Sequence, residues 1–298
     1  MLNNLYLGIS FFRAIFEYDF ILYAVIAGII VGVLAPLIGS VVIIRRLSFI
    51  ADTLSHFSLA GVCLGVILSK VIHVSFVSPV IMGVVFSIIG TFLIEKLRSL
   101  YTNYKEISMP IIMSLGLALS GLLINLSSDI NSKFTQSLLY GSIYSVDLSD
   151  LLIIIISFVL IILFIIFFYK KVITLCFDET YARVSGINTK LIGFLLTIIL
   201  SLIISLYIDI IGVLLIASLM ILPTASAILI GNSYKNSLII SGIFSEFSII
   251  LGFVLSYHLD LSTGPVVILI NHAIYIGIII YRAIRKQVLK KQANAIKK

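Results

Sequence analysis

The sequence predicts an all-α polytopic membrane protein with about nine transmembrane helices. Its mean hydropathy is +1.24, and 61% of the 298 residues are hydrophobic while only 11% are charged. Soluble domains rarely sustain such a composition. Apolar runs long enough to cross a bilayer recur from about residue 19 to residue 281. The runs are continuous and do not alternate between apolar and polar residues, which favours helices over a β-barrel.

Nine apolar segments are candidates for these helices. Their approximate bounds are 19–44, 47–69, 72–94, 107–128, 150–169, 190–208, 210–230, 237–257 and 265–283. The break near Asp209–Gly212 is the weakest, and eight helices result if residues 190–230 behave differently. No stretch between the segments is long enough for a second domain, so residues 1–298 are expected to form a single transmembrane domain.

The distribution of Lys and Arg predicts that the N-terminus lies outside the cell and the C-terminus in the cytoplasm. With this orientation, three of the twenty basic side chains lie outside, namely Arg13, Lys70 and Lys133. The cytoplasmic side then includes a polar loop at 170–190 and a basic tail at 282–298. Topology and attraction to the inner leaflet account for the net charge of +7. No basic patch alternates with exposed aromatic residues, so the expected partner is membrane lipid and not nucleic acid.

One predicted helix carries an aspartate and a histidine four residues apart, in the stretch IADTLSHFSLAG from Ile50 to Gly61. In a helix, Asp52 and His56 share a face and lie about 6 Å apart along the axis. If Arg46 marks the cytoplasmic boundary, His56 lies roughly 15 Å deep, about half of the hydrocarbon core. A carboxylate at that depth costs several kcal/mol unless it is paired or faces a cavity.

Three interpretations of this pair are open from spacing alone. Carboxylate and imidazole together suit a borderline divalent ion such as Zn²⁺ or Mn²⁺. The two side chains could instead form a purely structural hydrogen bond, or act as a proton relay. Cys63 falls on the same face but about 10 Å from His56 along the axis, so it is expected to be a small packing residue or else a second lining position.

Four other polar residues lie in or beside the predicted spans. Glu246 is in the middle of segment 237–257, where it either lines a dimer cavity or, as we favour, pairs with a polar group on a neighbouring helix. His258 and Asp260 are placed at the outer mouth, where they could meet a passing ion or a receptor, although loop residues of this kind are more often merely solvated. His272 is expected to be a buried histidine with a satisfied hydrogen bond.

The polar segment after residue 170 has the signals of a short capped helix. Asp178 is suited to cap its start, and Gly186 is suited to end it. By itself this pattern describes an ordinary loop helix.

Several motifs, in order along the chain, resemble the zinc/manganese permeases of ABC importers. Residues 45–62, RRLSFIADTLSHFSLAGV, resemble the family signature of paired Arg, D-A-L-S-H and L-P-G-V-A. Four further matches are YGS at 140–142, FDETYARVSGI at 177–187, GVLLIASLMILPTA at 212–225 and LDLSTGP at 259–265. Ala60 and Ser262 stand where the family usually has proline, so a kink at Ala60 is expected to be missing.

The resemblance implies a multi-pass permease in the plasma membrane of a bacterium. It implies a homodimer, a separate ATP-binding subunit and an extracellular lipid-anchored metal-binding receptor. Asp52 and His56 would be ligands of the transported Zn²⁺ or Mn²⁺, with no permanently bound cofactor. The implied ATPase-coupling residues are Asp178, Glu179, Ala182 and Gly186. These residues do not indicate which of the two metals is transported. A thiolate ligand would have favoured Zn²⁺, but none lies beside Asp52 and His56.

The chain is not expected to be an enzyme. It lacks G-x-x-x-x-G-K-[ST], so it cannot itself cradle ATP phosphates, and it lacks the H-E-x-x-H and G-x-S-x-G motifs of hydrolases. The alternative function is a proton-coupled secondary carrier for a metal or small solute, with Asp52, His56 and Glu246 as the relay and no ATPase.

Overall fold

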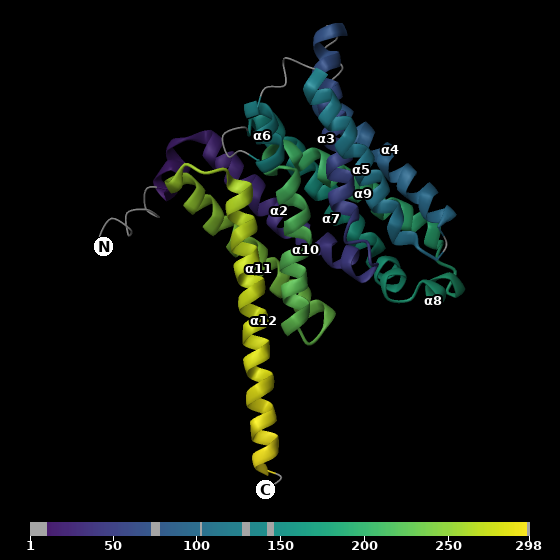
Figure 1. The fold of residues 1–298 in the computed structure, drawn as a ribbon, viewed down its shortest axis with the longest axis vertical. Coiled ribbons are helices and arrows are strands. Elements are labelled where there is room, and N and C mark those ends of the chain that lie inside the picture. The colour runs from purple at the N-terminus through teal and green to yellow at the C-terminus, as the bar shows by residue number, and fades with distance from the viewer. Residues whose placement is uncertain (1–10, 73–77, 102, 127–131, 142–145, 297–298) are drawn as a thin grey trace.

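The computed structural model is all-helical and describes residues 11–72, 78–101, 103–126, 132–141 and 146–296. Within that part of the chain, nine helices are long and apolar enough to cross a membrane, which confirms the predicted fold class (Figure 1). The elements are α2 (Asp19–Ile44), α3 (Ile50–Ile72), α4 (Pro79–Leu100), η1 (Lys105–Ile107), α5 (Ser108–Leu126), α6 (Ser132–Tyr140), α7 (Leu148–Phe177), α8 (Glu179–Val184), α9 (Thr189–Ile211), α10 (Val213–Ile230), α11 (Tyr234–Leu259) and α12 (Thr263–Ile296).

The weakest predicted boundary is a sharp corner in the structure. Gly212 separates α9 from α10 with a φ of 84°, a conformation that favours glycine. A Cβ at Gly212 would overlap the backbone of Tyr140 and Gly141, and a Cβ at Gly264 would overlap the carbonyl of Tyr140. The end of α6, the α9–α10 corner and the start of α12 therefore meet with their backbones in close contact. Glycine is required at Gly212 and Gly264 because a larger residue would not fit there.

Two segments predicted as a loop and a tail are largely helical. Helix α7 continues to Phe177 and α9 begins at Thr189, so only the short α8 and its flanks separate them. Burial explains the extension of α7, because Val172, Leu175 and Cys176 pack in one cluster with residues of α9. The basic segment that begins at residue 282 is a continuation of α12 as far as Ile296, and Figure 1 shows it projecting beyond the rest of the molecule.

The basic segments predicted to share one side of the membrane do lie at one end of the molecule. Arg45, Arg98, Lys105, Arg183 and Lys190 line a single hollow. At the same end, the ring of Phe177 meets that of Tyr234 with centroids 5.9 Å apart, which joins the end of α7 to the start of α11. In Figure 1, α8, the α10–α11 turn and the C-terminus lie toward this end. That it faces the cytoplasm stays a prediction.

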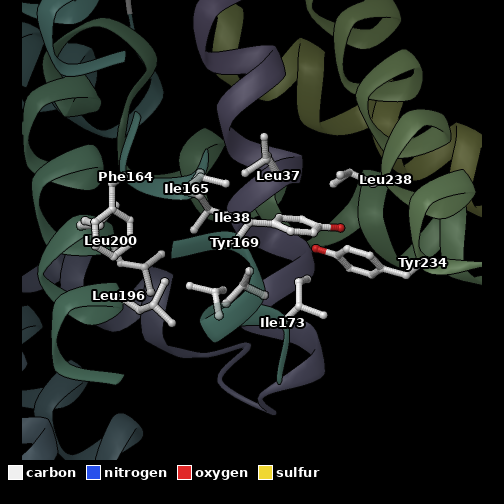
Figure 2. Close-up of a pocket in the computed structure, with 13 residues that line it drawn as sticks. Leu37, Ile38, Phe164, Ile165, Tyr169, Ile173, Leu196, Leu200, Tyr234 and Leu238 are labelled. Carbon is white, nitrogen blue, oxygen red and sulfur yellow. The ribbon is translucent and has the colours of Figure 1, made fainter. Parts of the chain in front are cut away.

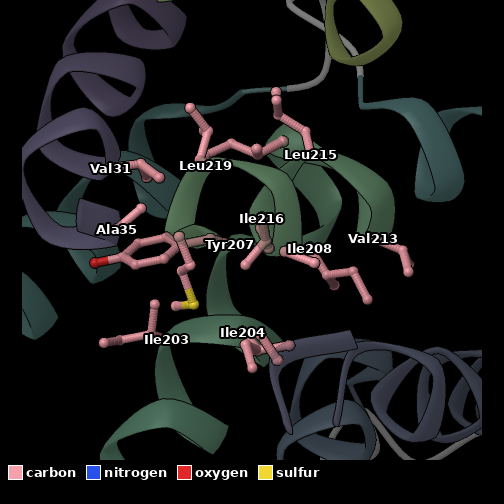
Figure 3. Packing of buried hydrophobic residues seen from close by; sticks show 14 of the residues in the cluster. Val31, Ala35, Ile203, Ile204, Tyr207, Ile208, Val213, Leu215, Ile216 and Leu219 are labelled. Atoms are coloured by element: carbon pink, nitrogen blue, oxygen red, sulfur yellow. The ribbon is translucent and has the colours of Figure 1, made fainter. Parts of the chain in front are cut away.

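The core draws side chains from α2, α3, α7, α9, α10 and α11, and Figure 3 shows the part of it around Tyr207, where α2, α9 and α10 meet. The Tyr207 hydroxyl lies 3.0 Å from the Ser157 hydroxyl, which satisfies it in an otherwise apolar region. A hollow of about 150 Å³ lies beside this core, between α2, α7, α9 and α11 (Figure 2). Its lining is apolar apart from Tyr169 and Tyr234, and it holds no Asp, Glu, His or Cys, so it offers no ligands to a metal ion.

Candidate metal site on helix α3

Asp52 and His56 lie together on α3, as their spacing predicts. His56 Nε2 is 3.6 Å from Asp52 Oδ1, and the two side chains are 9% and 30% exposed respectively. That distance is longer than an ordinary N–H···O hydrogen bond. His56 Nδ1 is buried and has no hydrogen-bond partner among the described residues. The pair therefore does not satisfy itself, and the imidazole keeps free ligand capacity next to a carboxylate.

Helix α3 holds this pair on a rigid support. It is the most deeply buried of the candidate spans within the described chain, with 78% of its apolar window buried. The Thr53 hydroxyl donates to the Phe49 carbonyl at 2.7 Å and shares this bond with the Met109 carbonyl of α5 at 3.2 Å. The Ser58 hydroxyl lies 2.9 Å from that of Ser205 on α9. Ser205 in turn donates to the Gly83 carbonyl of α4 at 3.2 Å. Polar contacts thus join α3 directly to α5 and α9, and α9 is joined in turn to α4.

Close backbone packing adds to these contacts. Gly116 of α5 lies against the backbone at His56 and Phe57, and Gly61 of α3 lies against the backbone of α4 at Met82. The close approach of Gly116 was not predicted from the sequence. The small residues around it in α5 are the signal that could have indicated it.

Among the residues that the structure describes, Asp52 and His56 are the two candidate ligands at this place. Cys63 is fully buried, has a free thiol and shares the helix with the pair, as expected of a packing residue. No group of three or more His, Cys, Asp and Glu side chains suited to a metal gathers within the described ranges. A complete coordination shell therefore requires ligands beyond those that the described residues place here. Helix α3 also runs unbroken through Ala60. This agrees with the expectation that the helix has no kink there, since Ala60 replaces the usual proline.

The segment after α7 forms the predicted short helix. Asp178 Oδ1 accepts a hydrogen bond from the Tyr181 amide at 2.9 Å and caps α8. Gly186 follows with a φ of 78° and Ala182 is fully buried, while Glu179 is exposed and pairs with Arg183 at 3.4 Å. Tyr181 and Val184 are 63% and 84% exposed, so α8 presents apolar side chains outward.

This chain matches the family model described as the ABC 3 transport family over residues 17–282. The chain belongs to the ABC 3 transport family. The match includes Asp52, His56 and the whole of α8, and it ends where α12 becomes basic. As an ABC 3 family member without an ATP-binding motif, the chain is the multi-pass permease subunit of an ABC transporter and not its ATPase.

Similar proteins agree with this assignment. A probable metal transport system membrane protein of Treponema pallidum is 31% identical over 86% of this chain and 92% of its own length. A high-affinity zinc uptake system membrane protein of Haemophilus influenzae is 29% identical, covering 87% of this chain and 96% of its own. A manganese transport system membrane protein of Listeria monocytogenes is 24% identical, covering 89% and 91%.

A solved structure has the same fold. PsaBC from Streptococcus pneumoniae, in complex with Fab, contains a chain that superposes with a TM-score of 0.78 at 26% identity. The superposition covers 90% of this chain and 94% of that one.

Three other candidate residues of this ABC 3 permease are Glu246, His258 and Asp260. No contact in the described part of the chain joins them to Asp52 or His56. Glu246 Oε1 is buried without a hydrogen-bond partner in the described part of the chain and lies against Gly32 of α2, so the favoured polar pairing of this atom is absent there. His258 Nε2 is likewise buried and unpaired, whereas Asp260 is exposed and ends α11 in a left-handed conformation.

The prediction for His272 was wrong in one respect. His272 is exposed on the surface of α12, although its Nδ1 lies 2.9 Å from the Ile268 carbonyl as a satisfied histidine would. A residue in an apolar span can face lipid or another chain and not the interior of its own chain. The position of His272 on the outer surface of α12 is of this kind.

Proposed function

We propose that this chain is the permease subunit of an ATP-driven importer of divalent metal ions, Zn²⁺ or Mn²⁺, and that the ion passes between Asp52 and His56. The observation that carries the proposal is an unsatisfied imidazole 3.6 Å from a carboxylate on the most buried of the described spans. The names of the similar proteins, which include manganese and zinc transport systems, support the same cargo.

The physical role of the pair is to lower the barrier for a dehydrated cation. A bare divalent ion in hydrocarbon faces a cost on the order of tens of kcal/mol. Carboxylate and imidazole from one chain offset part of this cost. A second copy related by two-fold symmetry would double the ligands to a loose shell of four. A site that passes ions must also release them, so incomplete coordination by each chain suits conduction better than a closed structural site would.

The other partners follow from the same proposal. A separate ATP-binding subunit would dock on α8 at the basic end of the molecule, which would then be cytoplasmic. Its contacts would include Tyr181 and Val184, because exposed apolar side chains in a polar segment suit a protein interface. A lipid-anchored receptor would deliver the ion at the opposite end, on the outside of a bacterial plasma membrane.

Reconstitution tests this function directly. The permease and its ATP-binding subunit are placed in proteoliposomes, and entry of radioactive Mn²⁺ or Zn²⁺ is followed with ATP and the receptor. Transport that requires ATP and the second subunit is the expected result. Transport by this chain alone, driven by a proton gradient, would instead support the carrier mechanism. The observation that favours a carrier is that Oε1 of Glu246 is buried and has no hydrogen-bond partner among the described residues.

A further inference from the structure

A basic hollow of about 310 Å³ lies where α2 and α4 end, beside α8 and the start of α9. Five cationic side chains and two carboxylates line it. Two of the cations are neutralised locally, since Arg98 lies 3.2 Å from Glu95 and Arg183 lies 3.4 Å from Glu179. The other three, Arg45, Lys105 and Lys190, take part in no ion pair within the described residues. The hollow therefore has an excess of positive charge.

The deepest of these cations gains most from an anion. The Arg45 guanidinium packs against Gly193 of α9, at 3.3 Å from the position of a Cβ there. Burial lowers the pKa of Arg45, and the nearby charge of Arg98 lowers it further, against the opposing effects of Cys176, Glu95 and Glu179. Arg98 Nε is itself buried, and no described residue provides it with an acceptor. The first turn of α9 adds the partial positive charge of a helix N-terminus to the same wall.

Apolar surface adjoins the hollow on the side of the membrane-spanning helices. Phe194 lines it and lies 5.2 Å from Phe92 between ring centroids. Phe92 and Leu191 are 54% and 53% exposed, respectively. A ligand that fills both regions needs an anionic group at one end and a hydrocarbon chain at the other.

We propose that this hollow binds the phosphate headgroup of an anionic phospholipid, with an acyl chain lying along Phe92 and the neighbouring surface of α4 and α9. Arg45, Lys105 and Lys190 would hold the phosphate. The site is distinct from Asp52 and His56, and the proposal does not depend on which ion the chain conducts. Because α8 forms one wall of the hollow, a bound lipid would also brace the segment that we propose as the ATPase contact.

The test uses the full-length chain in detergent, with lipid binding measured by native mass spectrometry. The probes are phosphatidylglycerol, phosphatidylcholine and inorganic phosphate. The variant Lys105→Gln/Lys190→Gln removes two exposed cations from the hollow. The variant Lys170→Gln/Lys171→Gln is the matched control, since it removes two exposed cations that do not line the hollow.

The unmodified chain is expected to prefer phosphatidylglycerol to phosphatidylcholine. The hollow variant should bind phosphatidylglycerol roughly tenfold or more weakly, while the control changes about twofold or less. Equal loss in both variants would overturn the proposal in favour of general surface attraction. Lipid binding that is unchanged while association with the ATP-binding subunit is lost would assign the hollow to a protein partner. Inorganic phosphate that binds as tightly as the lipid would assign it to a small anion.

Discussion

Gly116 of α5 lies against the main chain of His56 on α3. A Cβ at Gly116 would sit 3.0 Å from the His56 carbonyl carbon and 2.9 Å from the Phe57 amide nitrogen. These neighbours are backbone atoms, which cannot swing aside as the end of a long side chain can. The position of the candidate metal ligand is therefore tied to the packing of a second helix.

Gly116→Ala is expected to push α5 away from α3 at His56. Overpacking of this kind costs about 1–3 kcal/mol, and it should lower both the melting temperature in detergent and the rate of metal uptake. Gly121→Ala on the same helix is the control, because nothing lies within 4 Å of a Cβ there. Because alanine is a better helix former than glycine by about 1 kcal/mol, Gly121→Ala is expected to leave stability unchanged or raise it. Equal effects of the two substitutions would show that Gly116 does not set the spacing.

Glu246 and Asp52 are expected to respond differently to loss of charge. Glu246→Gln should keep most uptake, because Oε1 of Glu246 lies against Gly32 and has no hydrogen-bond partner among the described residues. Asp52→Asn should lose it, because a neutral amide supplies no negative charge to a cation. Uptake by cells that express equal amounts of each variant measures the difference. If Glu246→Gln abolishes uptake and Asp52→Asn keeps it, the roles of the two carboxylates are reversed.

The outward side chains of α8 are expected to carry the contact with the ATP-binding subunit. Tyr181→Ala/Val184→Ala should leave the permease folded and inserted but reduce its stimulation of ATP hydrolysis severalfold. The control is Leu100→Ala/Tyr104→Ala, which removes two apolar side chains of similar exposure (69% each) from the α4–η1 region. ATPase activity of the assembled complex is the readout. Unchanged stimulation in the α8 variant, or an equal loss in the control, would argue against α8 as the contact.

Much of the fold follows from the sequence because lipid constrains it so strongly. Every backbone group in hydrocarbon must be satisfied within the chain, so long apolar runs are helices, and nine were expected and found within the described residues. The helix ends were less predictable. Residues 170–177 look like a polar loop because of Lys170 and Lys171, yet Val172 and Leu175 bury against α9 and extend α7. That burial depends on tertiary packing, which periodicity does not contain.

The candidate site shows a similar division. Helical spacing alone places Asp52 beside His56. It does not indicate that their distance would exceed a hydrogen bond, nor that the other ring nitrogen would lack a partner. Both facts depend on where α4, α5 and α9 hold α3. The meeting of Gly141, Gly212 and Gly264 was equally hidden, because three segments far apart in the sequence create it.

His56→Cys separates a metal ligand from a structural histidine. A thiolate binds a borderline or soft ion such as Zn²⁺, but it does not reproduce a hydrogen bond between imidazole and carboxylate. The cysteine variant is therefore expected to keep more Zn²⁺ uptake than His56→Ala at equal protein level. Identical uptake by the two variants would mean that the side chain at this position does not ligate the ion.

Uptake by Asp52→Ala and His56→Ala, measured with radioactive Mn²⁺ and Zn²⁺ and normalised to the amount of permease in the membrane, tests the central claim most directly. Each variant removes two ligands from a symmetric dimer, so uptake should fall to near background while protein level and association with the ATP-binding subunit persist. A purely structural pair behaves differently, because loss of one partner strands the other in hydrocarbon and the protein level falls first. Normal uptake by well-expressed alanine variants, or uptake that falls only in proportion to protein level, would contradict the metal site.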